Sequence, residues 1–197
     1  MAKRKKRRST STLRRRKKAQ ERKRKLKAFV LAFSIMIVIL LAAGSLTVSF
    51  GQMSGYSMMP ELSNGDVVLI TKEQPKAFDL VYLKTPNKVN ERSVRRVIGM
   101  PGDELYYQDD QLVVNGQGKT ERYLNSRKAD LVEGVLTPDF TLEKLTGKNK
   151  VPQGHYFVLG DNRQGATDSR DYHFVKQSEI IGVVAARVFP LDAIKTY

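Results

Sequence analysis

The sequence predicts an all-β, antiparallel domain that follows a single N-terminal transmembrane helix. Three observations support this prediction. Sixteen of the 35 Lys and Arg residues lie within residues 1–27, and residues 28–50 then form an apolar run without a charged side chain. Short β-branched stretches separated by turn residues follow within residues 51–197. Strands at this spacing indicate a barrel or sandwich rather than βαβ units.

The net positive charge comes from an N-terminal tail at residues 1–27 and is not a property of the folded part. Its only acidic residue is Glu21, so it accounts for the formal net charge of +15, and the remaining chain has 19 basic and 19 acidic residues. Like charges at this density repel, so we expect disorder with nascent helix near residues 19–27. The tail has no interleaved aromatic residues, which argues against nucleic acid as a partner. Attraction to anionic membrane lipid explains it better.

Residues 28–50 are predicted to be an uncleaved membrane anchor. A helix of these 23 residues is long enough to cross a hydrocarbon layer of about 30 Å, and it lacks the polar stripe of a buried soluble helix. A cleavable signal peptide is the alternative, because residues 41–45 are small enough for cleavage, but its apolar region usually has only roughly 7–15 residues. The preceding cations predict a cytoplasmic N-terminus and an extracellular domain at residues 51–197.

The residues available for metal or cofactor chemistry are few. The chain contains no cysteine, which excludes disulfides, thiol nucleophiles and Cys-ligated metals. Its two histidines, His155 and His173, are too few to suggest a metal site, and there is no phosphate-binding loop. We therefore expect no cofactor and no metal. Without disulfides the exported domain needs an ordinary hydrophobic core, and residues 51–197 are enough to form one.

Seven β-branched stretches of the exported part are predicted to be strands. Turn signals such as Asn64-Gly65 and Pro101-Gly102 separate them, and Asp109-Asp110 predicts a hairpin. Residues 118–150 are more polar and irregular, so we expect a small cap inserted into the β-core, with one short helix near residues 141–145. The predicted strands are residues 66–72, 78–84, 93–100, 104–110, 111–116, 155–161 and 180–189.

A serine directly after the apolar run is the first candidate functional residue. Ser57 lies in the stretch SGYSMMPEL at residues 54–62. On local chemistry alone, a serine in such a Gly- and Pro-flanked turn is more often structural than catalytic. Three later blocks change this interpretation: NGDVVLITK with FDLVYL within residues 64–83, RRVIGMPGDEL at residues 95–105, and VPQGHYFVLGDNRQGATDSRDYHFV at residues 151–175.

In this order and behind one apolar span, the four blocks resemble the type I signal peptidases, and Gly55 before Ser57 resembles the Gram-positive form. The resemblance covers roughly residues 29–191. It implies a signal-peptidase-like β-core and a membrane-bound serine endopeptidase that cuts signal peptides from exported pre-proteins. In this family a Ser–Lys dyad does the chemistry, and Ser57 matches the serine. Signal peptides, membrane lipid and the secretion translocon are the implied partners. The last block is similar to the residues that brace the family's site, namely Asp161, Arg163, Asp168, Ser169 and Arg170.

The proton acceptor is where this sequence departs from the family. The family lysine corresponds to Arg95. A serine nucleophile needs a base that is neutral before the attack, whereas an arginine stays protonated in proteins. The family also commonly has a serine, which hydrogen-bonds the lysine, at the position of Ala166. His173 and Lys88 are poor replacements, because histidine-using relatives carry their histidine at the lysine position and a loop lysine is solvated and charged.

Two interpretations therefore remain open. In the first, the chain is a signal peptidase that processes exported pre-proteins at the cell membrane. In the second, it is catalytically impaired and binds exported chains or partners, for example pilins or sortase during pilus assembly. Retention of Ser57 favours the first interpretation, whereas Arg95 together with Ala166 favours the second.

Overall fold

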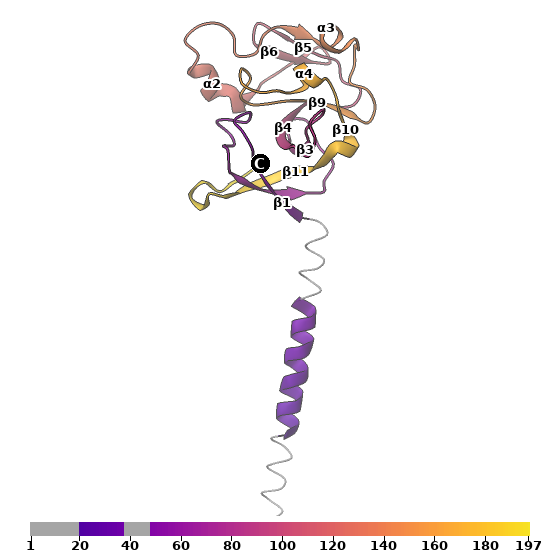
Figure 1. Cartoon of the computed structure of the whole chain (residues 1–197), viewed down its shortest axis with the longest axis vertical. Coiled ribbons are helices and arrows are strands. Elements are labelled where there is room, and N and C mark those ends of the chain that lie inside the picture. Colours follow the sequence, from indigo (N-terminus) through magenta and orange to yellow (C-terminus); the bar gives the residue numbers. More distant parts are fainter. Residues whose placement is uncertain (1–19, 38–47) are drawn as a thin grey trace, which may run out of the picture. The chain divides into compact units, whose positions relative to one another are not determined.

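The structure is a computed structural model that describes residues 20–37 and 48–197 (Figure 1). The chain divides into two compact units, Met1–Thr47 and Val48–Tyr197. In the first unit, residues 20–37 form a helix that begins inside the basic tail. The second unit contains all the predicted site residues, and we call it the β-domain.

The predicted anchor at residues 28–50 is only partly covered by the described residues. Its first ten residues belong to the helix at 20–37, and residues 38–47 lie outside the described part. The anchor prediction requires its last three residues to be helical, and here it is wrong. These residues pair as the start of a strand, β1 (Val48–Gln52). In residues 20–37 and 48–197, no helix is both long and apolar enough to cross a membrane.

The β-domain is built on an eight-stranded sheet in which all neighbours are antiparallel. The order is β1-β2-β11-β3-β4-β9-β10, and β12 pairs with β11. The interior strand β4 is buried at seven of its eight positions, because neighbours flank both edges and side chains cover both faces. The strands after β1 are β2 (Val67–Thr71), β3 (Leu80–Lys84), β4 (Arg92–Gly99), β9 (His155–Leu159), β10 (Val175–Lys176), β11 (Ile180–Phe189) and β12 (Lys195–Thr196).

A second, four-stranded antiparallel sheet forms with the order β7-β6-β5-β8. The β5–β6 hairpin turns at Asp109 and Asp110, whose φ angles of 49° and 60° suit a tight turn that short polar side chains tolerate. We predicted a small irregular cap at residues 118–150. The structure instead has an ordered sheet that already begins at Leu105, and the predicted cap contains only its later part. Its elements are β5 (Leu105–Gln108), β6 (Gln111–Val114), β7 (Gln117–Lys119), η1 (Arg122–Leu124), α2 (Asn125–Ala129), β8 (Phe140–Thr141) and α3 (Leu142–Thr146).

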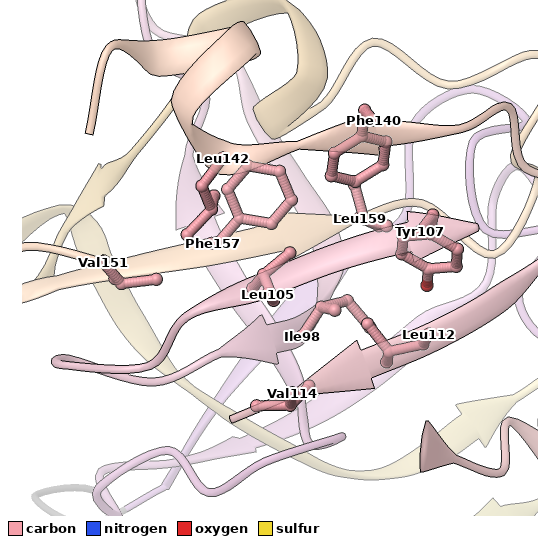
Figure 2. Packing of buried hydrophobic residues seen from close by; sticks show 10 residues of the cluster. All are labelled: Ile98, Leu105, Tyr107, Leu112, Val114, Phe140, Leu142, Val151, Phe157 and Leu159. Carbon is pink, nitrogen blue, oxygen red and sulfur yellow. The ribbon is translucent and has the colours of Figure 1, made fainter. Parts of the chain in front are cut away.

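One hydrophobic cluster joins the two sheets (Figure 2). Leu105, Tyr107 and Phe140 come from the second sheet, whereas Ile98 and Phe157 come from β4 and β9 of the large sheet. The rings of Phe140 and Phe157 lie 5.9 Å apart between centroids, a favourable distance for an aromatic pair. The cluster therefore attaches the second sheet to strands β4 and β9 of the large sheet.

The sequence predictions for this domain agree with the structure in class and in most elements. The fold is antiparallel β with few helices, and all seven predicted strands are present as β2, β3, β4, β5, β6, β9 and β11. The predicted short helix is α3. The remaining short helices are α4 (Ser169–Tyr172), η2 (Gln177–Glu179) and η3 (Leu191–Ala193).

Candidate active site

Ser57 lies in the connection between β1 and β2, and the hydrophobic core fixes the turn that carries it. The neighbouring Met58 is fully buried, and its carbonyl accepts the N–H of Leu62 at 3.0 Å. Gly55 takes a φ of +80°, in the region that favours glycine, and its N–H donates to Asn64 Oδ1 at 2.9 Å. Ser57 itself keeps 9% of its surface exposed. The turn therefore holds this hydroxyl at the edge of the core rather than in free solvent.

Arg95 on β4 contacts the hydroxyl of Ser57 from the sheet. Its Nη1 donates to Ser57 Oγ at 2.8 Å and to Val94 O at 2.6 Å. Its Nε and Nη2 both donate to Thr167 O, at 3.1 and 2.7 Å. Only 4% of Arg95 is exposed. Residues 57 and 95 thus form a side-chain pair, although 38 positions separate them.

The direction of this hydrogen bond determines what the pair can do. The guanidinium is only a donor, so Ser57 Oγ accepts from Arg95 and cannot pass its proton to it. The nearby phenol of Tyr172 is no substitute base, because burial raises its pKa more than the positive charge of Arg95 lowers it. The side chain of His173 is exposed, and Lys88 pairs with Glu91 in an exposed turn. None of these groups makes a hydrogen bond with Ser57 among the described residues.

Arg96 points to the opposite face of β4 from Arg95, as consecutive strand residues do. Its Nε donates to Asp161 Oδ1 at 2.8 Å, and its guanidinium lies 3.8 Å from the ring centroid of Tyr123. Burial alone would lower the pKa of Arg96, but the hydrogen bond and charge of Asp161 outweigh it, so the pKa is raised. This charged and stacked pair anchors the start of the loop after β9.

That loop, residues 160–168, packs directly against the backbone of Ser57. The N–H of Asn162 donates to Ser57 O at 3.0 Å, and its side chain donates to Tyr56 O at 3.1 Å. Position 160 must be glycine, because an added Cβ would lie 2.5 Å from Ser57 O. The loop therefore sets the orientation of the Ser57 peptide group.

Arg163 connects the same loop to the second sheet. It is 1% exposed, and its Nη2 donates to Glu121 Oε1 at 2.6 Å. Its Nη1 donates to Tyr107 Oη at 2.7 Å and to Thr137 Oγ1 at 2.9 Å, and its Nε donates to Gly160 O at 3.1 Å. All three nitrogens of this buried cation therefore have acceptors, and the network ties the loop to the cap.

The end of the loop is braced by Asp168, Ser169 and Arg170. Asp168 caps α4, accepts from the N–H of Gly160 at 3.0 Å, and pairs with Arg170 through two hydrogen bonds of 2.8 Å. Ser169 Oγ accepts from the N–H of Val158 in β9 at 2.9 Å. Because Thr167 lies next to this brace, the carbonyl that receives Arg95 is held in place.

Comparison with known proteins places the chain in a family. The model of the family described as "Signal peptidase, peptidase S26" matches residues 26–189. The chain belongs to the S26 signal peptidase family. Members of this family are serine endopeptidases, which agrees with the predicted reaction class.

Relatives of this signal peptidase come from Gram-positive bacteria. It is 45% identical over 141 residues to signal peptidase I of Bacillus caldolyticus, covering 69% of this chain and 76% of the relative. Signal peptidase IB of Staphylococcus aureus (strain Mu50) is 33% identical over 178 residues, covering 86% and 93%. The crystal structure of signal peptidase I from Enterococcus faecalis V583 is 41% identical, with a TM-score of 0.55 and coverage of 58% of this chain and 99% of that one. These matches confirm the resemblance predicted from the sequence.

The predicted site residues of this signal peptidase lie in one region of the β-domain. Ser57 and Arg95 touch directly, Gly55 shapes the turn, and Asp161 to Arg170 brace the adjoining loop. Sequence reasoning missed Asn162, which contacts Ser57 O, and Glu121, the acid that pairs with Arg163. It also missed the partners Arg96, Tyr107, Tyr123, Thr137 and Thr167. Arg96 had a usable signal, since it lies in the RVIGMPGD block, but Glu121 had none.

Proposed function

We propose that the chain removes signal peptides from exported pre-proteins, with Ser57 as the nucleophile and Arg95 as a fixed positive charge beside it. Family membership and the names of the relatives support the reaction class. The observation that carries the residue assignment is the 2.8 Å contact between Arg95 Nη1 and Ser57 Oγ. That contact joins the turn in the first family block to strand β4, on which the third block, RRVIGMPGDEL, begins.

The proposed reaction begins with an extended substrate strand whose scissile carbonyl faces Ser57 Oγ. The oxygen attacks the carbonyl carbon, and its proton passes to a solvent hydroxide because Arg95 cannot accept it. The backbone N–H of Ser57 and the guanidinium of Arg95 donate hydrogen bonds to the developing oxyanion. The amine leaves with a proton from water, and a second water then hydrolyses the acyl-enzyme to free Ser57.

The role of Arg95 in this proposal differs from that of a lysine base. A guanidinium lowers the energy of an alkoxide or oxyanion nearby, because the interaction is strong where water is excluded. It does not remove the proton, so turnover should be slow at neutral pH and should accelerate as hydroxide becomes available. The remaining proposed site residues, Gly55 and the loop brace Asp161 to Arg170, orient the Ser57 turn and do not touch the reacting atoms.

We also infer where the protein resides. The β-domain faces the outside of the cell membrane and residues 1–27 the cytoplasm. The sixteen cations of the tail and the apolar run that follows support this orientation. Exported precursors would then meet Ser57 as they emerge, with membrane lipid and the secretion translocon as neighbours.

A cleavage assay tests the proposed function. The full chain, purified in detergent or placed in liposomes, is incubated with a pre-protein and compared with Ser57→Ala. Cleavage at the signal peptide junction that disappears in the variant is expected. The absence of product from the unaltered chain, under conditions where a lysine-containing relative cleaves the same pre-protein, would contradict the proposal.

A second candidate function is binding of exported proteins without cleavage. The observation that favours it is the same hydrogen bond, because a serine that only accepts from a permanent cation has no protein base. Pilins or sortase would be partners of this kind. Pull-down of exported proteins by the unaltered chain and by Ser57→Ala distinguishes the two functions, since equal capture without product supports binding.

A further inference from the structure

Arg95 differs in its partners from the two other buried arginines of the β-domain, Arg96 and Arg163, and from the half-buried Arg170 and Arg187. Four arginines with side-chain exposures of 0–17% each pair with a carboxylate at 2.5–3.2 Å. They are Arg96, Arg163, Arg170 and Arg187, which pair with Asp161, Glu121, Asp168 and Asp66. Arg95 is 4% exposed and makes no ion pair with any carboxylate in residues 20–37 and 48–197. Its acceptors are two backbone carbonyls and the Ser57 hydroxyl.

A buried cation without an anion is costly unless other dipoles or a ligand compensate for it. The carbonyls of Val94 and Thr167 supply part of this compensation. They are neutral, however, so the full positive charge of Arg95 stays in a region of restricted water. An anion that reached the guanidinium would find a partner whose desolvation had already taken place during folding.

Further hydrogen-bond donors lie close to Arg95. Ser57 Oγ accepts from Arg95, so the hydroxyl proton of Ser57 is available for donation. The Ser57 backbone N–H has no acceptor among the described residues. Tyr172 Oη is buried near Arg95, and in the described part of the chain its proton has no acceptor. These groups form a set of donors around Arg95 that lacks a negatively charged acceptor.

We propose that Arg95 and Ser57 form a binding site for the C-terminal carboxylate of a peptide. This inference rests on the proposed function, because it assumes that a signal-peptide strand lies at Ser57. Cleavage would convert the carbonyl that faces Ser57 Oγ into this carboxylate. The small exposed area of Ser57 and Arg95 suits a slim terminal group rather than a bulky anion.

The charge of Arg95 determines which peptide end binds more tightly at this site. A lysine that must be neutral for catalysis offers little attraction to a product carboxylate, whereas an arginine offers a charge-assisted hydrogen bond to it. The chain should therefore hold a cleaved signal-peptide end more tightly than the matching uncharged end. This holds whether the chain made the cut itself or captured the product of another peptidase.

The test compares two peptides that differ only in the C-terminal group. A fluorescent peptide with the C-terminal half of a signal peptide, ending in Ala, is made with a free carboxylate and as the amide. Binding to the full chain in detergent is measured by fluorescence anisotropy. The carboxylate form should bind at least about tenfold more tightly, which corresponds to about 1.4 kcal/mol. This preference should disappear in Arg95→Gln.

Matched variants keep the result interpretable. Arg92→Gln makes the same substitution on the same strand at an exposed position, and it should retain the preference. If Arg95→Gln fails to fold, as judged by circular dichroism, Ser57→Ala is used instead and should reduce the preference by several-fold. Equal binding of the two peptides, loss of the preference in Arg92→Gln, or its persistence in folded Arg95→Gln would overturn the inference. A result of tight carboxylate binding without any pre-protein cleavage would support this inference while contradicting the proposed peptidase.

Discussion

Replacing Arg95 by lysine should increase the rate at which this signal peptidase cleaves a pre-protein. Arg95 Nη1 lies 2.8 Å from Ser57 Oγ, which is within the roughly 2.6–3.2 Å over which a general base takes a proton. A lysine nitrogen at this place would be almost fully buried, and burial lowers the pKa of a lysine toward neutrality. General-base catalysis contributes about 10²–10⁴-fold, so kcat should rise by about that factor.

The surroundings of Arg95 determine whether the lysine becomes neutral. The carbonyls of Val94 and Thr167, which now accept from Arg95, would also accept from a lysine ammonium and would favour its charged form. Adding Ala166→Ser supplies a hydroxyl near Gly160, beside the Ser57 backbone, that can help to position the new amine. We therefore expect Arg95→Lys with Ala166→Ser to exceed the single variant.

The assay is single-turnover cleavage of a labelled pre-protein in detergent, at pH values from 6 to 10. Both variants should show a rate that reaches a plateau above the pKa of the new lysine. The control is Ser57→Ala added to the double variant, which should abolish the gain. A double variant that is folded and yet cleaves no faster than the unaltered chain would refute the proposal that a missing base limits this site.

Two further substitutions test the loop and its brace. Glu121→Gln leaves a buried guanidinium without its carboxylate and should lower the free energy of unfolding by about 3–5 kcal/mol in urea denaturation, whereas Glu91→Gln, at an exposed ion pair, should change it by less than about 1 kcal/mol. If Glu121→Gln lowered the free energy of unfolding by less than Glu91→Gln, the pair of Glu121 and Arg163 would not stabilise the fold. Gly160→Ala places a Cβ 2.5 Å from Ser57 O and should cost about 1–3 kcal/mol and reduce cleavage, while Gly118→Ala, with no atom within 4 Å, should leave cleavage unchanged.

The strands of the β-domain could be predicted because their signals are local. Stretches such as residues 66–72 and 180–189 combine β-branched side chains with flanking turn residues, and both are strands in the structure. Strand β1 was missed for a physical reason. Residues 48–50 end an apolar run, and an apolar run fits a membrane helix or a strand equally well until its pairing partner is known. That partner, β2, begins at Val67, far along the chain.

The site shows a similar division between local and long-range information. Ser57, Arg95 and the loop residues could be found because they lie in sequence blocks with a recognisable order. Glu121 could not, because its pairing with Arg163 depends on how the second sheet packs and many other acidic residues were equally eligible. The acceptor of Arg95, the carbonyl of Thr167, is a backbone atom, and every residue has one. Partners of this kind can be identified only from the three-dimensional structure.

The pH dependence of cleavage by the unaltered chain tests the central claim most directly. If Ser57 attacks beside a permanently charged Arg95 and loses its proton to solvent, kcat/KM should rise by about tenfold per pH unit between pH 6 and 9 without a plateau. A plateau above an apparent pKa between 6 and 9 would reveal a protein base and contradict the account. Complete absence of product over this range would contradict the peptidase itself and leave binding as the function of the site.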